Sequence, residues 1–265
     1  MRKFLLKPKK SLGQNFILSR EVTKRIVVLA GNLEDFNVIE IGPGYGALTR
    51  EILAHNPKSL LAIEKDSNLE QYHNQLLSEH QGKYRIIEAD ALHVVEEELI
   101  ERPVKVIANL PYNVSVALFL KWLNNIKFFT SLTLMFQREV ADRIIARPNS
   151  KDYGSLSVLS QLICDIRKEF DIEPKEFFPR PNVYSSVVTV NPLPTRKFAV
   201  NLEALTRLTR TVFAHRRKML RNSLQNITSY TEAILENAKL SGNERPENLT
   251  VEQFCLLTNS MQTTY

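Results

Sequence analysis

The sequence of 265 residues contains only two cysteines, Cys164 and Cys255, which stand far apart and match no metal-ligand spacing. A disulfide framework and a zinc site are therefore not expected, and the pattern is typical of a reducing compartment. Long hydrophobic runs are also missing. The N-terminus has three consecutive apolar residues before the next lysine, which is too short for the core of a signal peptide, and no other run approaches membrane-spanning length. We therefore expect a cytoplasmic protein that uses no metal and does not enter a membrane.

Acidic residues are missing from two segments, residues 1–10 and residues 204–231. The first segment holds five basic residues and the second holds six, so together they carry eleven positive charges. The whole chain has a formal net charge of +6, and the remainder is therefore net −5. Positive charge concentrated in this way favours the binding of a polyanion such as a nucleic acid. A solvated tail and a solvated basic helix would give the same composition.

From residue 38 onward, short apolar runs alternate with longer amphipathic stretches, and no internal repeat is visible. The apolar runs predict strands at residues 38–41, 60–63, 84–87, 104–107, 132–136 and 187–190. Helices are predicted at residues 48–55, 69–80, 94–101 and 115–124. Strands separated by helices of this length need right-handed crossovers. The expected fold class is therefore α/β, with a doubly wound, mostly parallel, Rossmann-like sheet.

The composition changes at Asn191-Pro192-Leu193-Pro194, a run that can continue neither a strand nor a helix and is interpreted as a linker. After it, apolar residues recur at helical spacing, and Thr250 with Gln253 forms a capping-box signature before another apolar helix. We therefore divide the chain into a catalytic domain, residues 1–194, and a small all-helical domain, residues 195–265.

A glycine-rich run, Gly42-Pro43-Gly44-Tyr45-Gly46, directly follows the first predicted strand of this series. Glycines let the backbone turn tightly and approach a ligand, but this spacing alone also fits several nucleotide cofactors or a structural turn. Two acids narrow the choice: Glu64 ends the second strand, and Asp90 with Ala91 follows the third, at the edge where open α/β sheets bind ligands. No P-loop lysine is present, which argues against phosphate hydrolysis. Together these features favour an S-adenosylmethionine methyltransferase over a dehydrogenase.

The run Asn109-Leu110-Pro111-Tyr112 ends the fourth strand and so reaches the same sheet edge. The exocyclic amine of adenine is a poor nucleophile because its lone pair is delocalised into the ring. The Asn109 side-chain oxygen and the Leu110 carbonyl could accept its hydrogens and favour a pyramidal nitrogen, which is electrostatic preorganisation. Pro111 would stiffen the turn, and Tyr112 would offer a ring face for a splayed-out base. The structural alternative is an ordinary strand-to-helix turn.

In this order, the motifs resemble those of the bacterial small-subunit ribosomal RNA adenine dimethyltransferases, which confer kasugamycin sensitivity, and of their eukaryotic dimethyladenosine transferase relatives. The resemblance runs nearly from end to end. Besides the motifs above, it rests on residues 10–17 (KSLGQNFI), 136–141 (FQREVA), 148–154 (PNSKDYG), 177–185 (FFPRPNVYS) and 213–222 (FAHRRKMLRN).

The resemblance implies that Gly42 lies against the amino-acid portion of S-adenosylmethionine, that Glu64 holds the ribose and that Asp90 contacts the adenine amine. The other residues expected in the cofactor site are Asn15, Ile17, Gly44, Ala91 and Asn109. Family members commonly have leucine where this chain has Ile17, a change that would be silent if the contact is made by the backbone.

The resemblance further implies that Phe177 is the second aromatic wall for the target adenine, opposite Tyr112, unless Phe177 only packs in the core. It implies RNA phosphate contacts, which position the RNA rather than specify its sequence, unless the helix is merely solvated. These contacts are expected from Arg216, Arg217, Lys218 and Arg221.

The implied reaction transfers four methyl groups from S-adenosylmethionine, leaving S-adenosylhomocysteine, to the N6 amines of two adjacent adenosines. These adenosines lie in the 3′-terminal hairpin loop of 16S rRNA in the assembling 30S subunit. A loop suits this chemistry because its bases are partly unpaired and are therefore flipped at little cost. The implied enzyme is a cytoplasmic monomer that also serves as a small-subunit biogenesis factor.

Two other functions would share part of this pattern. A 23S rRNA adenine methyltransferase of the macrolide-resistance type would share the glycine loop and the catalytic run, but the motifs at residues 13–16, 149–154 and 216–218 are more similar to the small-subunit group. A non-catalytic RNA-binding assembly factor, or a transcription factor of the same fold, is disfavoured by the intact catalytic run and cofactor acids and by the lack of a transit-like leader.

Overall fold

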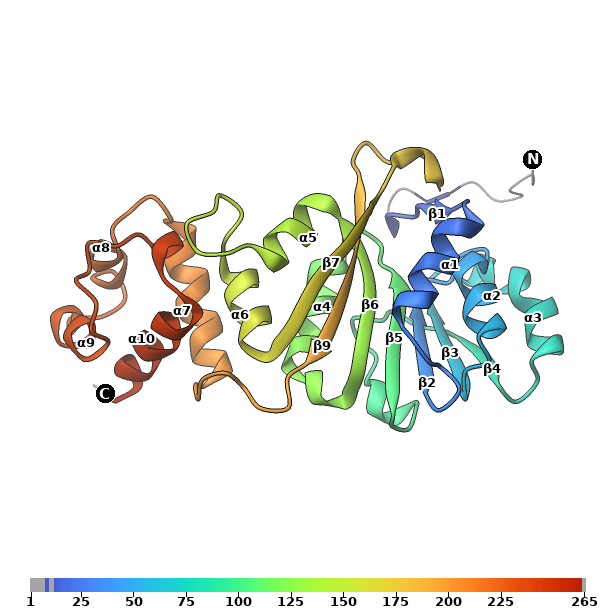
Figure 1. Cartoon of the computed structure of the whole chain (residues 1–265), viewed down its shortest axis with the longest axis horizontal. Helices are drawn as coiled ribbons and strands as arrows, with labels where there is room; N and C mark the ends of the chain where they lie inside the picture. Colours follow the sequence, from blue (N-terminus) through green and yellow to red (C-terminus); the bar gives the residue numbers. More distant parts are fainter. Residues whose placement is uncertain (1–7, 10–11, 264–265) are drawn as a thin grey trace. The chain divides into compact units, whose positions relative to one another are not determined.

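The computed structural model describes residues 8–9 and 12–263. By its internal contacts the chain divides into two compact units (Figure 1). Unit 1 consists of residues 1–141 and 167–192, and unit 2 consists of residues 142–166 and 193–265. The predicted linker at residues 191–194 contains the last of the three boundaries between the units, after residue 192. Residues 142–166, which the sequence analysis assigned to the catalytic domain, instead belong to the same unit as the C-terminal helices.

The centre of unit 1 is a seven-stranded sheet in the order β4-β3-β2-β5-β6-β9-β7. Its strands are β2 (Asn37–Ile41), β3 (Ser59–Glu64), β4 (Tyr84–Glu88), β5 (Val104–Asn109), β6 (Phe129–Gln137), β7 (Cys164–Ile172) and β9 (Ser185–Pro192). The pairs from β4 through to β6 are parallel, and β9 is antiparallel to β6. The strand order reverses between β2 and β5, which is the topological switch point where such sheets bind ligands. The expected α/β, mostly parallel fold is confirmed.

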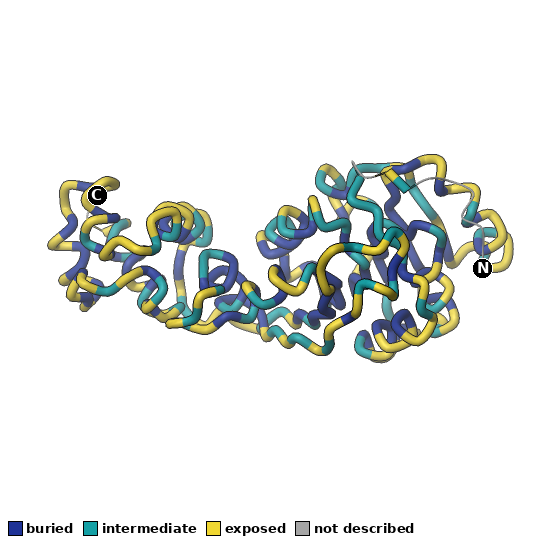
Figure 2. The backbone as a smooth tube through the Cα atoms, turned by 90° about the horizontal axis from the view of Figure 1, so that it is seen from above, coloured by how far each residue is buried: buried dark blue, intermediate teal, exposed yellow. Residues whose placement is uncertain are grey.

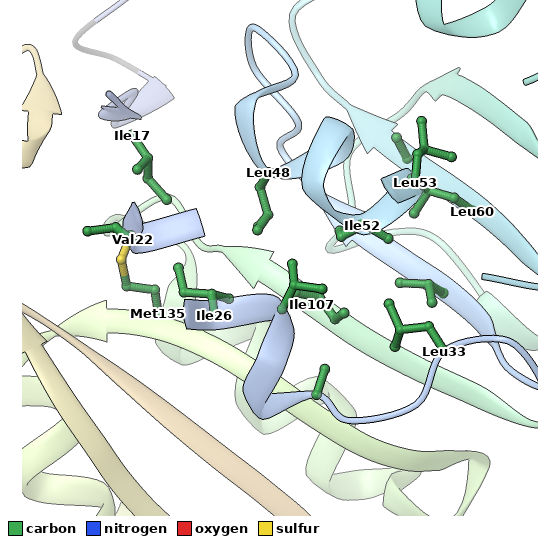
Figure 3. Close-up of a cluster of buried hydrophobic side chains, with 14 of the residues drawn as sticks. Ile17, Val22, Ile26, Leu33, Leu48, Ile52, Leu53, Leu60, Ile107 and Met135 are labelled. Carbon is green, nitrogen blue, oxygen red and sulfur yellow. The ribbon is translucent and has the colours of Figure 1, made fainter. Parts of the chain in front are cut away.

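Helices cover both faces of this sheet. They are α1 (Arg20–Leu29), α2 (Ala47–Ala54), α3 (Asn74–Glu79), α4 (Ser115–Asn124) and α5 (Arg138–Ile145). Figure 3 shows Ile26 of α1 and Ile52 of α2 in one buried cluster with Met135 of β6. Because successive residues of a strand point to opposite faces, Phe136 points away from that cluster, and its ring lies 5.6 Å from the Phe119 ring of α4. Helix α4 therefore covers the opposite face.

The central strands β2, β3 and β5 are buried almost along their whole length (Figure 2). This agrees with near-continuous apolar runs in parallel strands that are covered on both faces. By contrast, β7 was not predicted, because exposed charged residues occupy every second position along it and leave no continuous apolar run. It lies at the edge of the sheet, where one side chain in two faces water.

Two predicted helices differ from the structure. Residues 69–80 form a 3₁₀ turn, η2 (Ser67–His73), followed by the short α3, and residues 94–101 contain only the 3₁₀ turn η3 (Glu96–Glu98). The remaining unit 1 elements are too short to be read from periodicity. They are the 3₁₀ turns η4 (Ile126–Phe128) and η5 (Pro174–Glu176) and the antiparallel strands β1 (Phe16–Ile17) and β8 (Phe177–Phe178).

The described part of unit 2 is mainly helical. Its helices are α6 (Ser155–Ile163), α7 (Leu202–Ala214), α8 (Leu220–Leu224), α9 (Thr231–Asn237) and α10 (Val251–Thr263), with the 3₁₀ turn η6 (Pro246–Asn248) before α10. The predicted capping box is present, because Thr250 N donates to Gln253 Oε1 at 2.9 Å and Gln253 N donates to Thr250 Oγ1 at 3.2 Å. Within residues 8–9 and 12–263, none of the helices has the length and apolarity needed to cross a bilayer.

Candidate active site

A cavity of about 980 Å³ opens at the carboxyl ends of β2, β3 and β5 in unit 1. One wall is the N-terminal strap, which we define as residues 12–18. The predicted site residues that line the cavity are Asn15, Ile17, Gly42, Glu64, Asp90, Ala91, Asn109, Leu110 and Pro111. The fold therefore brings together, from five separate parts of the chain, most of the residues that the sequence assigned to one site. Gly44, Tyr112 and Phe177 are outside this lining.

Gly44 acts through close packing. Its φ of 57° lies in the left-handed region, and a Cβ atom at this position would stand 2.6 Å from Cδ1 of Phe16. Any larger residue would therefore be strained and would also push the N-terminal strap away from the loop. Gly42, with a φ of 64°, lies at the end of β2, and its N–H donates to the Ile63 carbonyl at 2.9 Å.

Glu64 holds the glycine loop from the end of the neighbouring strand. One carboxyl oxygen accepts from Gly44 N at 3.3 Å, and the other accepts from Asp66 N at 2.9 Å. Burial raises the pKa of this carboxyl, and the backbone hydrogen bonds from Asp66 and Gly44 partly offset that shift. Each oxygen has a second lone pair, so Glu64 can also accept from a ligand in the cavity that it lines.

Asp66, which the sequence analysis did not single out, ties the N-terminal strap to the same strand end. Its carboxylate accepts from Lys9 Nζ at 2.8 Å and from Gln14 Nε2 at 2.9 Å. Burial alone would raise its pKa, but hydrogen bonds from Lys9, Asn68 and Gln14 prevail and lower the pKa to about 2. Lys9 is one of the five basic residues in the N-terminal segment. The other four lie outside the described residues; they are Arg2, Lys3, Lys7 and Lys10.

The loop after β4 is held by a buried acid that the sequence analysis also missed. Glu96 Oε1 accepts from Lys121 Nζ at 2.8 Å and from Trp122 Nε1 at 2.7 Å. The same ammonium donates to the Ala91 carbonyl at 2.8 Å, so α4 fixes the loop at the cavity wall. Asp90 itself accepts from Lys65 Nζ at 2.8 Å, and this hydrogen bond is the main reason why its pKa is lowered. The carboxyl is therefore ionised at neutral pH.

The side chains of the catalytic run are held in defined orientations. Asn109 Nδ2 donates to the Asn15 carbonyl at 2.8 Å, and because a carbonyl can only accept, this bond settles which end of the amide is oxygen. Leu110 is 1% exposed. The Tyr112 hydroxyl lies 2.6 Å from the Ser185 hydroxyl, and burial raises its pKa, so the ring stays a neutral phenol.

Phe177 is placed differently from the expectation. It is 2% exposed and belongs to the buried cluster of unit 1, so it offers no open face to a base in this structure. The cause is the pairing of β8 with β1, in which Ile17 stands opposite Phe177 and Phe16 stands opposite Phe178. Alternation along β8 sends the two phenylalanines to opposite sides. Phe178, which is 39% exposed, lines the cavity instead.

The basic segment of unit 2 is partly used in internal pairs. The Arg216 guanidinium binds Glu247 Oε2 at 2.9 Å and the Lys151 carbonyl at 2.7 Å. Arg221 pairs with Glu232 and donates to the Ser241 carbonyl at 2.8 Å. Arg217 and Lys218, between these two arginines, are exposed. Of the four predicted phosphate contacts, two are therefore occupied within the unit.

Among the residues that the structure describes, no group of three or more His, Cys, Asp or Glu side chains is arranged to hold a metal ion.

Comparison with known proteins decides the family. A family model described as ribosomal RNA adenine dimethylase matches residues 5–263. The chain belongs to the ribosomal RNA adenine dimethylase family. A relative named ribosomal RNA small subunit methyltransferase A, from Wolbachia sp. subsp. Brugia malayi (strain TRS), is 86% identical over 261 residues, which cover 98% of this chain and 100% of the relative. The predicted family and the predicted rRNA adenine dimethyltransferase activity are thus confirmed.

Solved structures show the same fold for this dimethylase family member. A dimethyladenosine transferase from Plasmodium falciparum is similar with a TM-score of 0.81 and 24% identity, covering 94% of this chain and 98% of that one. The 23S rRNA methyltransferase ErmE is similar with a TM-score of 0.69 and 23% identity, covering 93% of this chain and 99% of that one. At these identities the likeness concerns the fold alone.

Replacing Asp66 with asparagine should weaken S-adenosylmethionine binding by about 3- to 10-fold, because an amide keeps only one of the two oxygens that accept from Lys9 and from Gln14 of the strap. Since the pKa of Asp66 is lowered in the fold, its stabilising effect is present above the unfolded value of 3.8 and is lost only as the pH falls toward 2. Calorimetric titration at pH 7.5 measures the affinity, with the exposed Asp35→Asn as control. Equal affinities for wild type and Asp66→Asn would contradict this role.

Glu40 gives a second test, because it is 1% exposed at the cavity and its Oε2 has no hydrogen-bond partner among the described residues. Its pKa is raised to about 8, mainly by burial; Thr49 lowers the pKa and the neighbouring Glu64 raises it, and both effects are included in that value. The folded state therefore keeps a proton that the unfolded chain releases above its value of 4.5. The free energy of unfolding should therefore fall as the pH rises from 4.5 to 8, by up to about 1.4 kcal/mol per pH unit.

Urea unfolding of the ligand-free protein at pH 5, 6.5 and 8 measures this effect. Glu40→Gln should become progressively more stable than wild type as the pH rises, whereas Glu88→Gln, at the exposed end of β4, should follow wild type. Parallel pH profiles for wild type and Glu40→Gln would show that Glu40 is ionised in the fold.

Proposed function

We propose that this dimethylase uses S-adenosylmethionine to methylate the N6 amines of adenosines in small-subunit rRNA. The observation that carries this proposal is the Asn109 amide. Its nitrogen is engaged by the Asn15 carbonyl, so its oxygen is the group left to accept from a substrate amine at the cavity. The name of the 86% identical relative supports the small subunit as the source of the RNA.

The hydrogen-bonding groups that line the cavity fit S-adenosylmethionine. Three carboxyl groups are distributed along its wall, at Glu40, Glu64 and Asp90, and Glu40 has a buried oxygen atom without a partner among the described residues. We assign Glu64 to the ribose hydroxyls and Asp90 to the adenine amine, with Gly42 beside the amino-acid portion. The remaining contacts are assigned to Asn15, Ile17, Gly44, Ala91 and Asn109. When bound, the cofactor supplies an electrophilic methyl group on a sulfonium ion.

In this proposal, Asn109 Oδ1 and the Leu110 carbonyl accept the two hydrogens of the adenine amine and favour its pyramidal form. Pro111 keeps the turn rigid. Tyr112 presents its ring to the base, and its hydroxyl is already fixed by Ser185. The nitrogen becomes acidic once it carries the methyl group, so its proton leaves to water and no general base is required. A second round on the same nitrogen gives the dimethylamine.

We further assign catalysis to unit 1 and RNA binding to unit 2, with Arg217 and Lys218 as the exposed phosphate contacts. The proposed substrate is the pair of adjacent adenosines in the 3′-terminal loop of 16S rRNA, within the assembling 30S subunit in the cytoplasm. The enzyme would act as a monomer and also assist subunit biogenesis. The alternative 23S target gains nothing from the likeness to ErmE, because that likeness concerns the fold alone.

Asn109→Ala should lower kcat for methyl transfer to immature small subunits by about 10²- to 10³-fold, the size of effect seen when one preorganised hydrogen-bonding group is removed. Affinity for S-adenosylmethionine should fall much less, by about 10-fold or less, because the cofactor wall loses only the hydrogen bond from Asn109 to the Asn15 carbonyl. Mass spectrometry of the rRNA measures dimethyladenosine, and calorimetry measures cofactor binding.

The substrate control is protein-free 23S rRNA. Dimethyladenosine formed by the wild type on 23S rRNA alone would refute the small-subunit assignment, and retained dimethylation by Asn109→Ala would refute the role of Asn109.

Replacing both Arg217 and Lys218 with alanine should weaken binding to small subunits and reduce the slope of log K against log salt by about 1 to 2, because two phosphate contacts are removed. Arg216 is left in place, since its pairing with Glu247 supports unit 2. A matched control removes two exposed charges from unit 1, directly before β3 and β4, by Lys58→Ala with Lys83→Ala. An unchanged salt slope in the Arg217 and Lys218 variant would mean that these residues do not touch RNA.

A further inference from the structure

An exposed aromatic ring lies next to the catalytic run and has no role in the mechanism above. Tyr184 is 40% exposed and directly precedes Ser185, whose hydroxyl is 2.6 Å from the Tyr112 hydroxyl. Ser185 itself is fully buried and pairs with Gln137 at the carboxyl end of β6. Tyr184 therefore stands one residue away from the group that fixes the proposed base platform.

Tyr184 is also held from a second direction. Arg138 N donates to the Tyr184 carbonyl at 2.9 Å, and the Arg138 guanidinium lies 4.9 Å from the centre of the tyrosine ring. Arg138 is the first residue of α5, directly after β6, so it belongs to the sheet edge at which the cavity opens. The backbone from the Tyr184 carbonyl into Ser185 is thus anchored, while Tyr184 remains 40% exposed.

Two further exposed apolar side chains belong to the same part of the chain. Val183 is 43% exposed, and Phe178, which lines the cavity, is 39% exposed. We call Phe178, Val183 and Tyr184 the rim patch. All three belong to residues 177–185, the segment that connects β8 with β9.

An anchored, partly exposed ring with an arginine over one face is suited to one class of ligand, an unpaired nucleotide whose base stacks on the other face. Every base has a π-face that can stack on an aromatic ring, and an arginine can bind the attached phosphate. The position of Tyr184 near Tyr112 also favours this ligand. A base held at Tyr112 is joined to each neighbouring nucleotide by one phosphodiester linkage, so a neighbour must lie close by. A protein partner would need a much larger apolar surface than these three side chains offer.

We propose that Tyr184, together with Arg138, is the stacking platform for the nucleotide next to the adenosine held at Tyr112. This inference rests on the proposed function and deepens it, since it gives the site a means to recognise two adjacent unpaired nucleotides. Stacking of one base corresponds to roughly a 10-fold effect on affinity. Removing the ring should therefore raise KM and Kd for RNA and leave kcat at saturation within about twofold.

The test uses the full-length protein and hairpin RNAs with 2-aminopurine on either side of the target adenosine, because its fluorescence is quenched on stacking. Wild type and Tyr184→Phe should quench the probe at one of the two positions. Tyr184→Ala should lose that quenching and bind about 10-fold more weakly. A matched control is Tyr230→Ala, which removes a 51% exposed tyrosine from unit 2 and should keep the quenching. Unfolding midpoints of all variants establish that they are folded.

A hairpin with an abasic nucleotide at the quenched position separates stacking from packing. Wild type should bind it about 10-fold more weakly, and Tyr184→Ala should lose nothing further. Quenching by Tyr184→Ala equal to that of wild type, or no quenching by wild type at either position, would overturn the platform. Failure of the wild type to methylate small subunits would instead overturn the proposed function, whatever the fluorescence shows.

Discussion

The hydrogen bond from the Asn109 amide to the Asn15 carbonyl joins the two halves of the site. On one side it orients the amide oxygen that faces the proposed substrate amine. On the other side it holds the N-terminal strap, which forms a wall of the cavity. The strap is fixed again through Asp66 and through pairing with β8, so cofactor enclosure and catalytic geometry share their supports. Loss of the Asn109–Asn15 hydrogen bond therefore removes one support from the strap and one from the proposed catalytic amide.

The carboxyl groups around the cavity differ in charge because their surroundings differ. Glu40 and Glu64 lie under the glycine loop, where burial is the main influence and raises the pKa of each. Asp66 and Asp90 each meet a lysine, and hydrogen bonds lower the pKa of both. The cavity thus has neutral or weakly acidic groups at its floor and ionised groups at its margin. A cationic ligand entering it would favour ionisation of the floor groups and so would release protons.

The sequence predicted the sheet well because parallel strands buried on both faces must be apolar, and β2, β3 and β5 are the clearest case. The same reasoning missed the edge strand β7, because charged residues interrupt its apolar residues at every second position. It also missed the grouping of residues 142–166 with unit 2, which depends on contacts between distant segments. At the site, the order of motifs along parallel strands located Glu64, Asp90 and Asn109. It could not reveal Asp66 or Glu96, whose roles arise from contacts between distant segments.

Phe177 and the basic segment show where a motif is insufficient even when the family is right. The sequence has phenylalanine at both residues 177 and 178, and the register of β8 against β1 decides which of the two faces the cavity. Likewise, six bases without an acid between residues 204 and 231 suggest one continuous RNA surface. Glu232, which directly follows that window, pairs with Arg221, and the more distant Glu247 pairs with Arg216. A local count of charge therefore overstates the surface available to phosphates, because pairing is decided by the fold rather than by proximity in sequence.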